Sequence, residues 1–259
     1  MACQRGCNFS LWLTQNKRAA FMSPFSISLM EANMSFDLKH LPKTFQDLVI
    51  ADPLNANIIQ QYCSEIPSKP LLLAGPPGAG KTEAARVIAQ SYFKTKNIQN
   101  MTWEFNGGSS GKDLQSQIMA EANFQLFGNQ DKALVVINEI DTLDLRAQQP
   151  LFRDFMDAKR SYIRFIATTN HKSRILGAIL SRFRIVDLTP PTNQDWVPRA
   201  KAILEAEDMS PSTQDVALML QSFEGSARDL IDHLEETVMA WRAAQSLAPI
   251  TLQSSGSAI

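Results

Sequence analysis

The sequence predicts an α/β fold in which a five-stranded parallel sheet is flanked by helices and followed by a small all-helical domain. Three observations support this prediction. Short apolar runs alternate with helical patterns between residues 70 and 189, a glycine-rich loop follows the first apolar run, and only helical patterns come after Pro190-Pro191. Strands that are separated by helices usually pair in parallel, and the helices then cover both faces of the sheet.

Each expected strand is a short apolar run. The five runs cover residues 71–74, 102–105, 134–137, 163–168 and 185–188. Apolar residues three and four positions apart predict helices over 83–93 and 112–127, and beyond residue 190 over 196–206, 213–223 and 227–244. We therefore expect an α/β domain over 36–189, a helical lid domain over 190–248 and a flexible tail over 249–259.

Residues 1–35 differ from the rest of the chain. They hold Arg5, Lys17 and Arg18 but no acidic residue before Glu31, and serines interrupt their apolar residues. A secretory signal needs a cleaner apolar run. The segment is therefore a transit peptide, a disordered extension, or a stretch upstream of the true start.

The composition argues against several classes of protein. Of the 259 residues, 44% are hydrophobic, so the chain can bury a large core. It carries 25 Lys and Arg against 26 Asp and Glu, and therefore has no overall positive charge that would attract DNA. No run approaches the roughly 20 apolar residues of a membrane span. Three cysteines and three dispersed histidines provide neither a disulfide framework nor a zinc site, and the odd cysteine count indicates a reducing compartment.

The segment from Gly75 to Thr82 reads GPPGAGKT and fits the phosphate-binding pattern G-x-x-x-x-G-K-[ST]. Its glycines let backbone N–H groups point at phosphate oxygens, and the following helix adds the positive end of its dipole. Lys81 would reach the β- and γ-phosphates, and Thr82 would offer a hydroxyl to Mg²⁺. The alternative is a glycine-rich turn without a ligand. We expect ATP and Mg²⁺ to bind at Gly75, Pro76, Pro77, Gly78, Ala79, Gly80, Lys81 and Thr82.

Acidic and amide residues follow the third expected strand. Downstream of a phosphate loop, this is the expected place for a magnesium-associated residue and a water-activating carboxylate. Glu139 fits the second role, whereas the metal position holds the neutral Asn138 where Asp is usual. Either hydrolysis survives with weaker metal binding, or the site binds nucleotide and hydrolyses it slowly. Asp141 is either a substitute ligand or the cap of the next helix.

Asn170 follows the fourth expected strand. Ligands bind beyond the carboxyl ends of parallel strands, which would bring Asn170 near Glu139 and the γ-phosphate. Its amide could then orient the attacking water. Taken alone, an asparagine after a strand is a turn residue.

These motifs resemble those of the AAA+ ATPases over about residues 40–240. Besides the phosphate loop, the resemblance depends on the INEID and ATTN segments, on Ser181-Arg182-Phe183 and on Gly225-Ser226-Ala227-Arg228. Within that superfamily the chain is most similar to the small ATPase subunits of clamp loaders, including those of phages. The segments that carry this likeness are 41–48, 105–113, 147–156 and the Ser-Arg-Phe motif, which is similar to the Ser-Arg-Cys motif of those subunits.

The resemblance implies a role for each site residue. Asn170 would be sensor 1, Arg228 would be sensor 2, and Arg182 would be an arginine finger that enters the site of a neighbouring subunit. Arginine suits these roles because its planar charged group binds phosphate oxygens through two donors. Alternatively, Arg182 is a surface residue and Arg228 pairs with Asp229 or Asp232. The residues implied to bind nucleotide beyond the loop are Val49, Glu83 and Arg228.

The resemblance also implies partners: other clamp-loader subunits in a homo- or hetero-oligomeric ring or spiral, a sliding clamp and primer–template DNA, without membrane contact. It places the protein in the cytoplasm of a bacterium or phage-infected cell, or in the nucleus or an organelle of a eukaryote. Five basic residues are candidates to bind DNA phosphates: Lys112, Arg146, Arg153, Lys159 and Arg160. Alternatively, they are charged surface residues that contact only solvent.

Two features besides Asn138 depart from the family pattern. The chain ends soon after the expected lid, whereas clamp-loader subunits continue into a helical collar domain. We therefore expect one of three situations: the subunits assemble through AAA+ contacts alone, the collar lies on another chain, or the gene is truncated or split. Pro150 falls inside the helix expected to face DNA, where it would kink the first turns. The alternatives are another AAA+ motor, such as a branch-migration enzyme, or a nucleotide-binding structural subunit with weak hydrolysis.

Overall fold

The computed structural model describes residues 35–95, 104–106, 111–127, 132–143 and 149–247, and the chain divides into two compact units, residues 1–41 and 42–259. In the described part of the first unit, the short helix α3 (Phe36–Lys39) begins at the first residue of the expected α/β domain. The expectations for residues 1–34 and for the tail lie outside the described residues.

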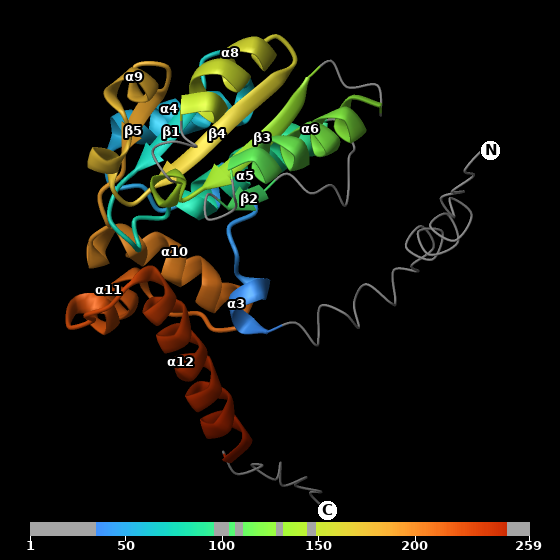
Figure 1. Ribbon diagram of the computed structural model, residues 1–259. Helices are drawn as coiled ribbons and strands as arrows, with labels where there is room; N and C mark the ends of the chain where they lie inside the picture. The colour runs from blue at the N-terminus through green and yellow to red at the C-terminus, as the bar shows by residue number, and fades with distance from the viewer. Residues whose placement is uncertain (1–34, 96–103, 107–110, 128–131, 144–148, 248–259) are drawn as a thin grey trace, which may run out of the picture. The chain divides into compact units, whose positions relative to one another are not determined.

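Five parallel strands form one sheet in the second unit, in the order β2-β3-β4-β1-β5 (Figure 1). The predicted five-stranded parallel sheet is confirmed, and its strand ends agree with the predicted ones within about one residue wherever both are described. Residues 102 and 103, the expected start of the second strand, lie outside the described residues. The strands are β1 (Leu71–Ala74), β2 (Glu104–Asn106), β3 (Ala133–Asn138), β4 (Ile163–Thr169) and β5 (Arg184–Asp187).

Helices connect the strands. Before residue 190 they are η2 (Phe45–Asp47), α4 (Pro53–Ser64), α5 (Lys81–Thr95), α6 (Gly111–Phe127), η3 (Ile140–Thr142), η4 (Gln149–Phe155), α8 (Met156–Lys159), η5 (Lys172–Arg174) and α9 (Gly177–Leu180). Pro150 lies in the first turn of η4, which has π-helical hydrogen bonding, and α-helical geometry begins at Met156. In the described residues, no helix is both long and apolar enough to cross a membrane.

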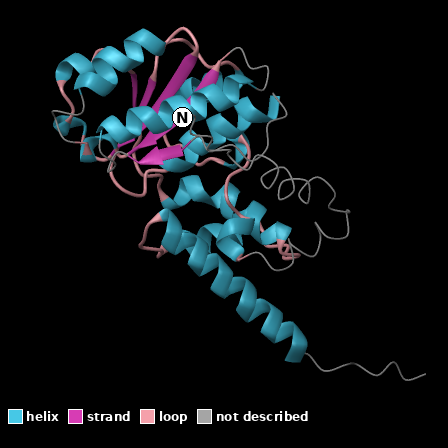
Figure 2. Ribbon diagram, turned by 45° about the vertical axis from the view of Figure 1, so that its right-hand side comes forward, coloured by secondary structure: helices cyan, strands magenta, loops and turns pink. Residues whose placement is uncertain are grey.

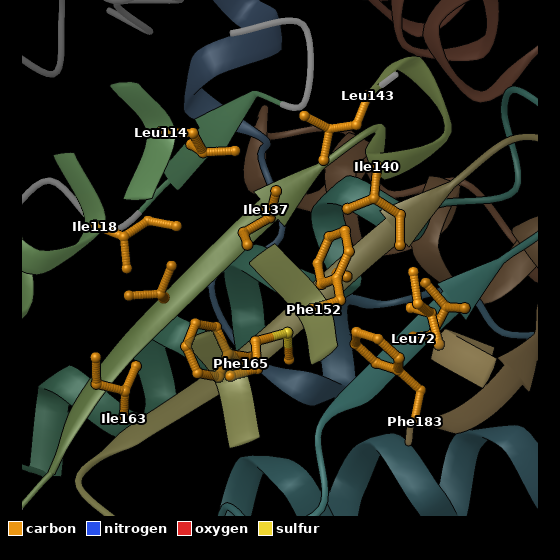
Figure 3. Close-up of a cluster of buried hydrophobic side chains, with 14 of the residues drawn as sticks. Leu72, Leu114, Ile118, Ile137, Ile140, Leu143, Phe152, Ile163, Phe165 and Phe183 are labelled. Carbon is orange, nitrogen blue, oxygen red and sulfur yellow. The ribbon is translucent and has the colours of Figure 1, made fainter. Parts of the chain in front are cut away.

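Both faces of the sheet are covered by helices (Figure 2). Successive residues of a strand point to opposite faces, so each strand contributes to two cores. Along β3, Val135 and Ile137 join Leu114 of α6 in one buried cluster (Figure 3), whereas Leu134 and Val136 join the cluster beside α5. Burying one such side chain fully stabilises the fold by about 1.5–3 kcal/mol. The two cores therefore hold the carboxyl ends of the strands in fixed positions.

The chain after residue 190 folds into α10 (Asn193–Ala206), α11 (Thr213–Gln221) and α12 (Ala227–Leu247). The helices α10 and α11 each begin with a capping box, in which Thr192 and Ser212 exchange hydrogen bonds with the acidic residue three positions later. The second compact unit contains both these helices and the sheet. Their assignment to a separate lid domain stays a prediction.

An ion pair links α10 to the segment before β1. Arg199 Nη1 lies 2.5 Å from Asp47 Oδ1 of η2, and both side chains are largely buried. Burial raises the pKa of the Asp47 carboxyl, but hydrogen bonds from Thr44 and Lys43 and the charge of Arg199 lower that pKa more, so it lies below its usual value. The carboxylate therefore stays ionised and keeps α10 attached to η2.

Candidate nucleotide-binding site

The glycine-rich loop connects β1 to α5. Gly78 and Gly80 have φ values of 80° and 78°, which lie in the left-handed region that glycine enters without steric cost. The loop begins at the carboxyl end of β1, an interior strand of the sheet, and ends where α5 begins at Lys81. Loops in this position, next to the positive end of a helix dipole, bind phosphate.

Gly75, the first residue of this loop, leaves no room for a side chain. A Cβ at Gly75 would lie 2.2 Å from the Leu188 carbonyl oxygen. That carbonyl cannot move aside easily, because Leu188 N–H donates to the Ala74 oxygen at 2.7 Å and continues the pairing of β1 with β5. The close approach therefore fixes the place at which the loop leaves the sheet.

Gly75→Ala is expected to lower the free energy of unfolding by about 2–4 kcal/mol, because the new methyl group would collide with backbone. The matched control is Gly177→Ala, since a Cβ at Gly177 would meet no atom within 4 Å. Urea denaturation followed by circular dichroism measures both variants. Equal stability of the two proteins would contradict the predicted collision.

Lys81 is held inside the site. Its side chain is only 7% exposed, and Nζ donates to the Pro76 carbonyl at 2.7 Å. Burial lowers the pKa of the Lys81 amine, while the nearby Asp141 and Glu139 carboxylates oppose this effect. The structure thus brings the predicted lysine and the acidic residues after β3 close enough for their charges to interact.

Glu139 follows β3 in the left-handed conformation, with φ 53° and ψ 51°. This conformation costs a residue with a side chain about 1–2 kcal/mol, and such strain collects at functional sites. Two contacts hold it: Glu139 N–H donates to Thr168 Oγ1 at 3.1 Å, and Thr142 Oγ1 donates to the Glu139 carbonyl at 2.7 Å. The exposed carboxylate accepts no hydrogen bond from the described residues. The backbone is therefore fixed while the carboxylate is available to a ligand.

Asp141 lies in η3, directly after β3, and its side chain binds the end of β4. Its Oδ1 accepts from Thr169 Oγ1 at 2.7 Å and from Asn170 N–H at 3.2 Å. The expected role as a helix cap is therefore wrong, because the nearest helix, η3, contains Asp141 and has no side-chain cap. Asp141 instead positions Asn170, whose own side-chain amide makes no hydrogen bond within the described part of the chain.

Asp141→Ala is expected to lower the free energy of unfolding by about 1–3 kcal/mol, because the buried Thr169 hydroxyl would lose its acceptor. Asp141→Asn is the matched control, since an amide oxygen can accept both hydrogen bonds. Thermal unfolding of the two variants, compared with the unchanged protein, measures the difference. Equal losses would mean that the charge of Asp141 stabilises the site and that its hydrogen bonds do not.

Asn138, the last residue of β3, forms hydrogen bonds through both the nitrogen and the oxygen of its side-chain amide. Its Nδ2 donates to Glu104 Oε1 of β2, and its Oδ1 accepts from Thr168 Oγ1 of β4 at 3.1 Å. The orientation of Asn138 is therefore set by both neighbouring strands.

The donors around the loop fit Mg²⁺, which prefers oxygen ligands and keeps several waters. Thr82 supplies a hydroxyl, Asn138 supplies an amide oxygen, and Glu139 and Asp141 supply negative charge. The described residues contain no group of three or more His, Cys, Asp or Glu side chains that could hold a metal ion. These residues would therefore hold Mg²⁺ together with phosphate oxygens and water, which is usual in nucleotide sites.

Arg182 follows α9 and is held by its own chain. Nε donates to Asp157 Oδ2 at 3.1 Å, Nη2 lies 3.0 Å from the same oxygen, and Nη1 donates to the Ala178 carbonyl at 2.6 Å. The structure therefore does not bring Arg182 together with Lys81 and Glu139. The Arg182 side chain is still 30% exposed, so part of it is accessible from outside the chain.

Arg228 lies in the first turn of α12, is exposed and makes no ion pair within the described residues. The alternative in which it pairs with Asp229 or Asp232 is therefore wrong. Asp229 instead accepts from Ser226 N–H at 2.6 Å. A Cβ on Gly78 would lie 3.6 Å from Ser226 Cβ, so the start of α12 lies beside the phosphate loop.

Glu83 and Val49 are the remaining residues that were expected to bind nucleotide. Both carboxylate oxygens of Glu83 accept from Arg86 Nη1, at 3.0 and 2.9 Å, and Val49 is half-buried in the segment after η2. Their roles toward nucleotide stay predictions.

Sequence reasoning missed Glu104, whose carboxylate binds Asn138 and which belongs to no motif. The available signal was a charged residue between the aromatic residues Trp103 and Phe105.

Comparison with known proteins finds a family model and relatives that are similar to this chain. Residues 71–190 match the model of the ATPase family associated with various cellular activities (AAA). The replication factor C small subunit of Staphylothermus marinus is 29% identical over 218 residues, and replication factor C subunit 5 of Homo sapiens is 28% identical over 211 residues. These matches cover 83% and 81% of this chain but 63% and 62% of the relatives, so the chain spans less than two thirds of their length.

Solved structures share the fold. A RuvB mutant of Thermotoga maritima has a TM-score of 0.62 at 18% identity, over 80% of this chain and 68% of its own. Domain III of the Thermotoga maritima replication initiation protein DnaA has a TM-score of 0.56 at 16% identity, over 78% of this chain and 90% of its own. At these identities the likeness concerns the fold alone.

Proposed function

We propose, from the AAA ATPase module that this chain contains and from its relation to replication factor C small subunits, that the protein is an ATP-hydrolysing subunit of a sliding-clamp loader. It would open a DNA polymerase clamp and place it on primer–template DNA. The observation that carries the proposal is the grouping of Lys81, Glu139, Asp141 and Asn170 at the carboxyl end of the sheet. The similarity to a replication factor C small subunit over 83% of the chain supports a clamp loader rather than another kind of AAA enzyme.

In this proposal the loop and Lys81 bind the phosphates of ATP. The Lys81 amine exchanges the Pro76 carbonyl for phosphate oxygens, because a charged donor binds a charged acceptor more strongly than a neutral one. Mg²⁺ bound near Thr82 and Asn138 would neutralise charge on the β- and γ-phosphates. Arg228, beside the loop and without an ion pair in the described residues, contacts the γ-phosphate from α12.

Glu139 and Asn170 act on the attacking water. The Glu139 carboxylate accepts a proton from the water as it attacks the γ-phosphorus, which is the role of a general base. The Asn170 amide orients that water, and the hydrogen bond from Asn170 N–H to Asp141 keeps Asn170 in place.

Arg182 completes the site of a neighbouring subunit in this proposal. Within its own chain it pairs with Asp157 instead of approaching Lys81. An arginine supplied by a second subunit stabilises the charge that develops during phosphoryl transfer. Hydrolysis would then require a ring or spiral in which one subunit contributes Arg182 to the next.

One observation favours a second function, that of a nucleotide-binding structural subunit that hydrolyses little. Asn138 is neutral at the metal-associated position, which weakens the field on a bound cation and its waters. In that case another chain of the complex would hydrolyse ATP, and this chain would bind nucleotide and provide contacts.

Steady-state ATP hydrolysis separates the two functions. The purified chain is assayed alone, with primer–template DNA, and with DNA plus the clamp encoded by the same genome. Stimulation by DNA and clamp together is the expected result for a clamp-loader ATPase. ATP binding without turnover under every condition would favour the structural subunit, and hydrolysis indifferent to DNA and clamp would favour another AAA motor.

A further inference from the structure

We propose that Glu104 supplies the negative charge that Asn138 lacks, so that the two residues together serve as the acidic position of the magnesium–nucleotide site. This inference rests on the proposed function, because it requires that the chain binds ATP with Mg²⁺. It assigns a role to a residue of β2 that belongs to no nucleotide-binding motif of the sequence. It also predicts that the effect of Asn138→Asp on Mg²⁺ binding depends on Glu104.

The register of the sheet brings the two side chains together. Glu104 is paired with Val136 in the parallel ladder of β2 and β3, and Asn138 lies two residues beyond Val136. Residues two apart on a strand share a face, so Glu104 and Asn138 are diagonal neighbours. Val136 belongs to the core beside α5, which places both polar residues on the face of the sheet that α5 covers.

The hydrogen bonds give each atom a defined partner. Asn138 Nδ2 donates to Glu104 Oε1, and Asn138 Oδ1 accepts from Thr168 Oγ1. Glu104 Oε2 forms a long ion pair with Arg86 Nη2, at 3.8 Å. The amide of Asn138 thus joins the Glu104 carboxylate to the end of β4.

Arg86 does not fully neutralise this carboxylate. Its Nη1 donates to both oxygens of Glu83, at 3.0 and 2.9 Å, which is a much closer contact than the one with Glu104. The Arg86 charge is therefore shared between two carboxylates. Glu104, the carboxylate that binds Asn138, is the less closely compensated of the two.

An aspartate at position 138 would meet a second carboxylate. The Asn138→Asp change would remove the amide N–H that binds Glu104, and two negative groups would lie at hydrogen-bonding distance. Like charges in contact destabilise each other when both stay ionised. The effect of Asn138→Asp on cation binding should therefore depend on whether residue 104 is charged.

A double-mutant cycle tests this dependence without turnover. Binding of a non-hydrolysable ATP analogue is measured by titration calorimetry at a series of Mg²⁺ concentrations, for the unchanged protein, Glu104→Gln, Asn138→Asp and the double variant. The readout is the Mg²⁺ concentration that gives half of the maximal affinity increase. Glu236→Gln, an exposed change on α12, is the control for the loss of one carboxylate.

Glu104→Gln is expected to raise the required Mg²⁺ concentration by about 5–20-fold, and the double variant should return to within about threefold of the unchanged protein, as coupled neighbours do. Asn138→Asp alone should improve Mg²⁺ binding less than it does in the Glu104→Gln background. Additive effects, or a Glu104→Gln protein with an unchanged Mg²⁺ requirement, would overturn the inference and leave the proposed function standing. An unchanged protein that binds no nucleotide would overturn both.

Discussion

Glu139→Gln is expected to slow steady-state ATP hydrolysis by about 10²–10⁴-fold while leaving ATP binding close to that of the unchanged protein. Glutamine has nearly the same shape as glutamate, but its amide cannot accept the proton of the attacking water. Residue 139 would keep its left-handed backbone, because the contacts with Thr168 and Thr142 involve main-chain atoms of residue 139. Phosphate release measures the rate, and calorimetry measures binding.

Glu236→Gln removes a carboxylate far along α12 and is the matched control for this experiment. It should leave both rate and affinity unchanged. If Glu139→Gln hydrolyses ATP at the original rate, Glu139 is not the general base. If the unchanged protein shows no hydrolysis to lose, the structural-subunit function gains support.

Arg182→Ala is expected to reduce hydrolysis by about 10³-fold or more, which is the contribution of an arginine finger supplied in trans. The expected mechanism makes a further prediction about mixtures. Arg182→Ala chains retain their own Glu139, and Glu139→Gln chains retain Arg182. A mixture of the two inactive variants should therefore recover part of the activity, because some interfaces combine an intact finger with an intact base.

Asp157→Ala tests whether Arg182 acts through its partner within the chain. It removes the ion pair with Arg182 and keeps the arginine. Hydrolysis should stay within about fivefold of the unchanged rate, since partly exposed ion pairs contribute only about 0–1 kcal/mol. A loss as large as that of Arg182→Ala would show that hydrolysis needs the pair with Asp157, and no recovery in the mixture would contradict a role of Arg182 in the site of a neighbouring subunit.

The positions of strands were predictable because their signals are local. Pro70 and Gly75 bound the four apolar residues of β1, and the observed strand has those limits. The phosphate loop was predictable for the same reason, since its glycines and Lys81 follow one another in sequence. Helix α4 also has a local signal: Asp52 caps it by accepting a 2.9 Å hydrogen bond from Leu54 N–H, and Pro53 begins it.

Other features of the site depend on pairing between distant strands. The role of Asp141 is set by Thr169, the last residue of β4, and by Asn170, which follows it, whereas the residues next to Asp141 in sequence suggested a helix cap. The left-handed backbone of Glu139 likewise depends on the Thr168 hydroxyl. Glu104 is visible as a site residue only when the register of β2 against β3 is known. Local patterns carry no information about such register.

The interior position of β1, between β4 and β5, has a consequence for folding during synthesis. Leu71 pairs with Ile166 and Arg184, and β1 has no other strand neighbours among the described residues, so its partners are synthesised long after it. Non-local pairing of this kind slows folding and leaves apolar segments open to aggregation in the meantime. The phosphate loop, which extends from β1, acquires its final support only when β4 and β5 have emerged. A nascent chain that ends before β5 would therefore depend on chaperones, and added nucleotide would not rescue it.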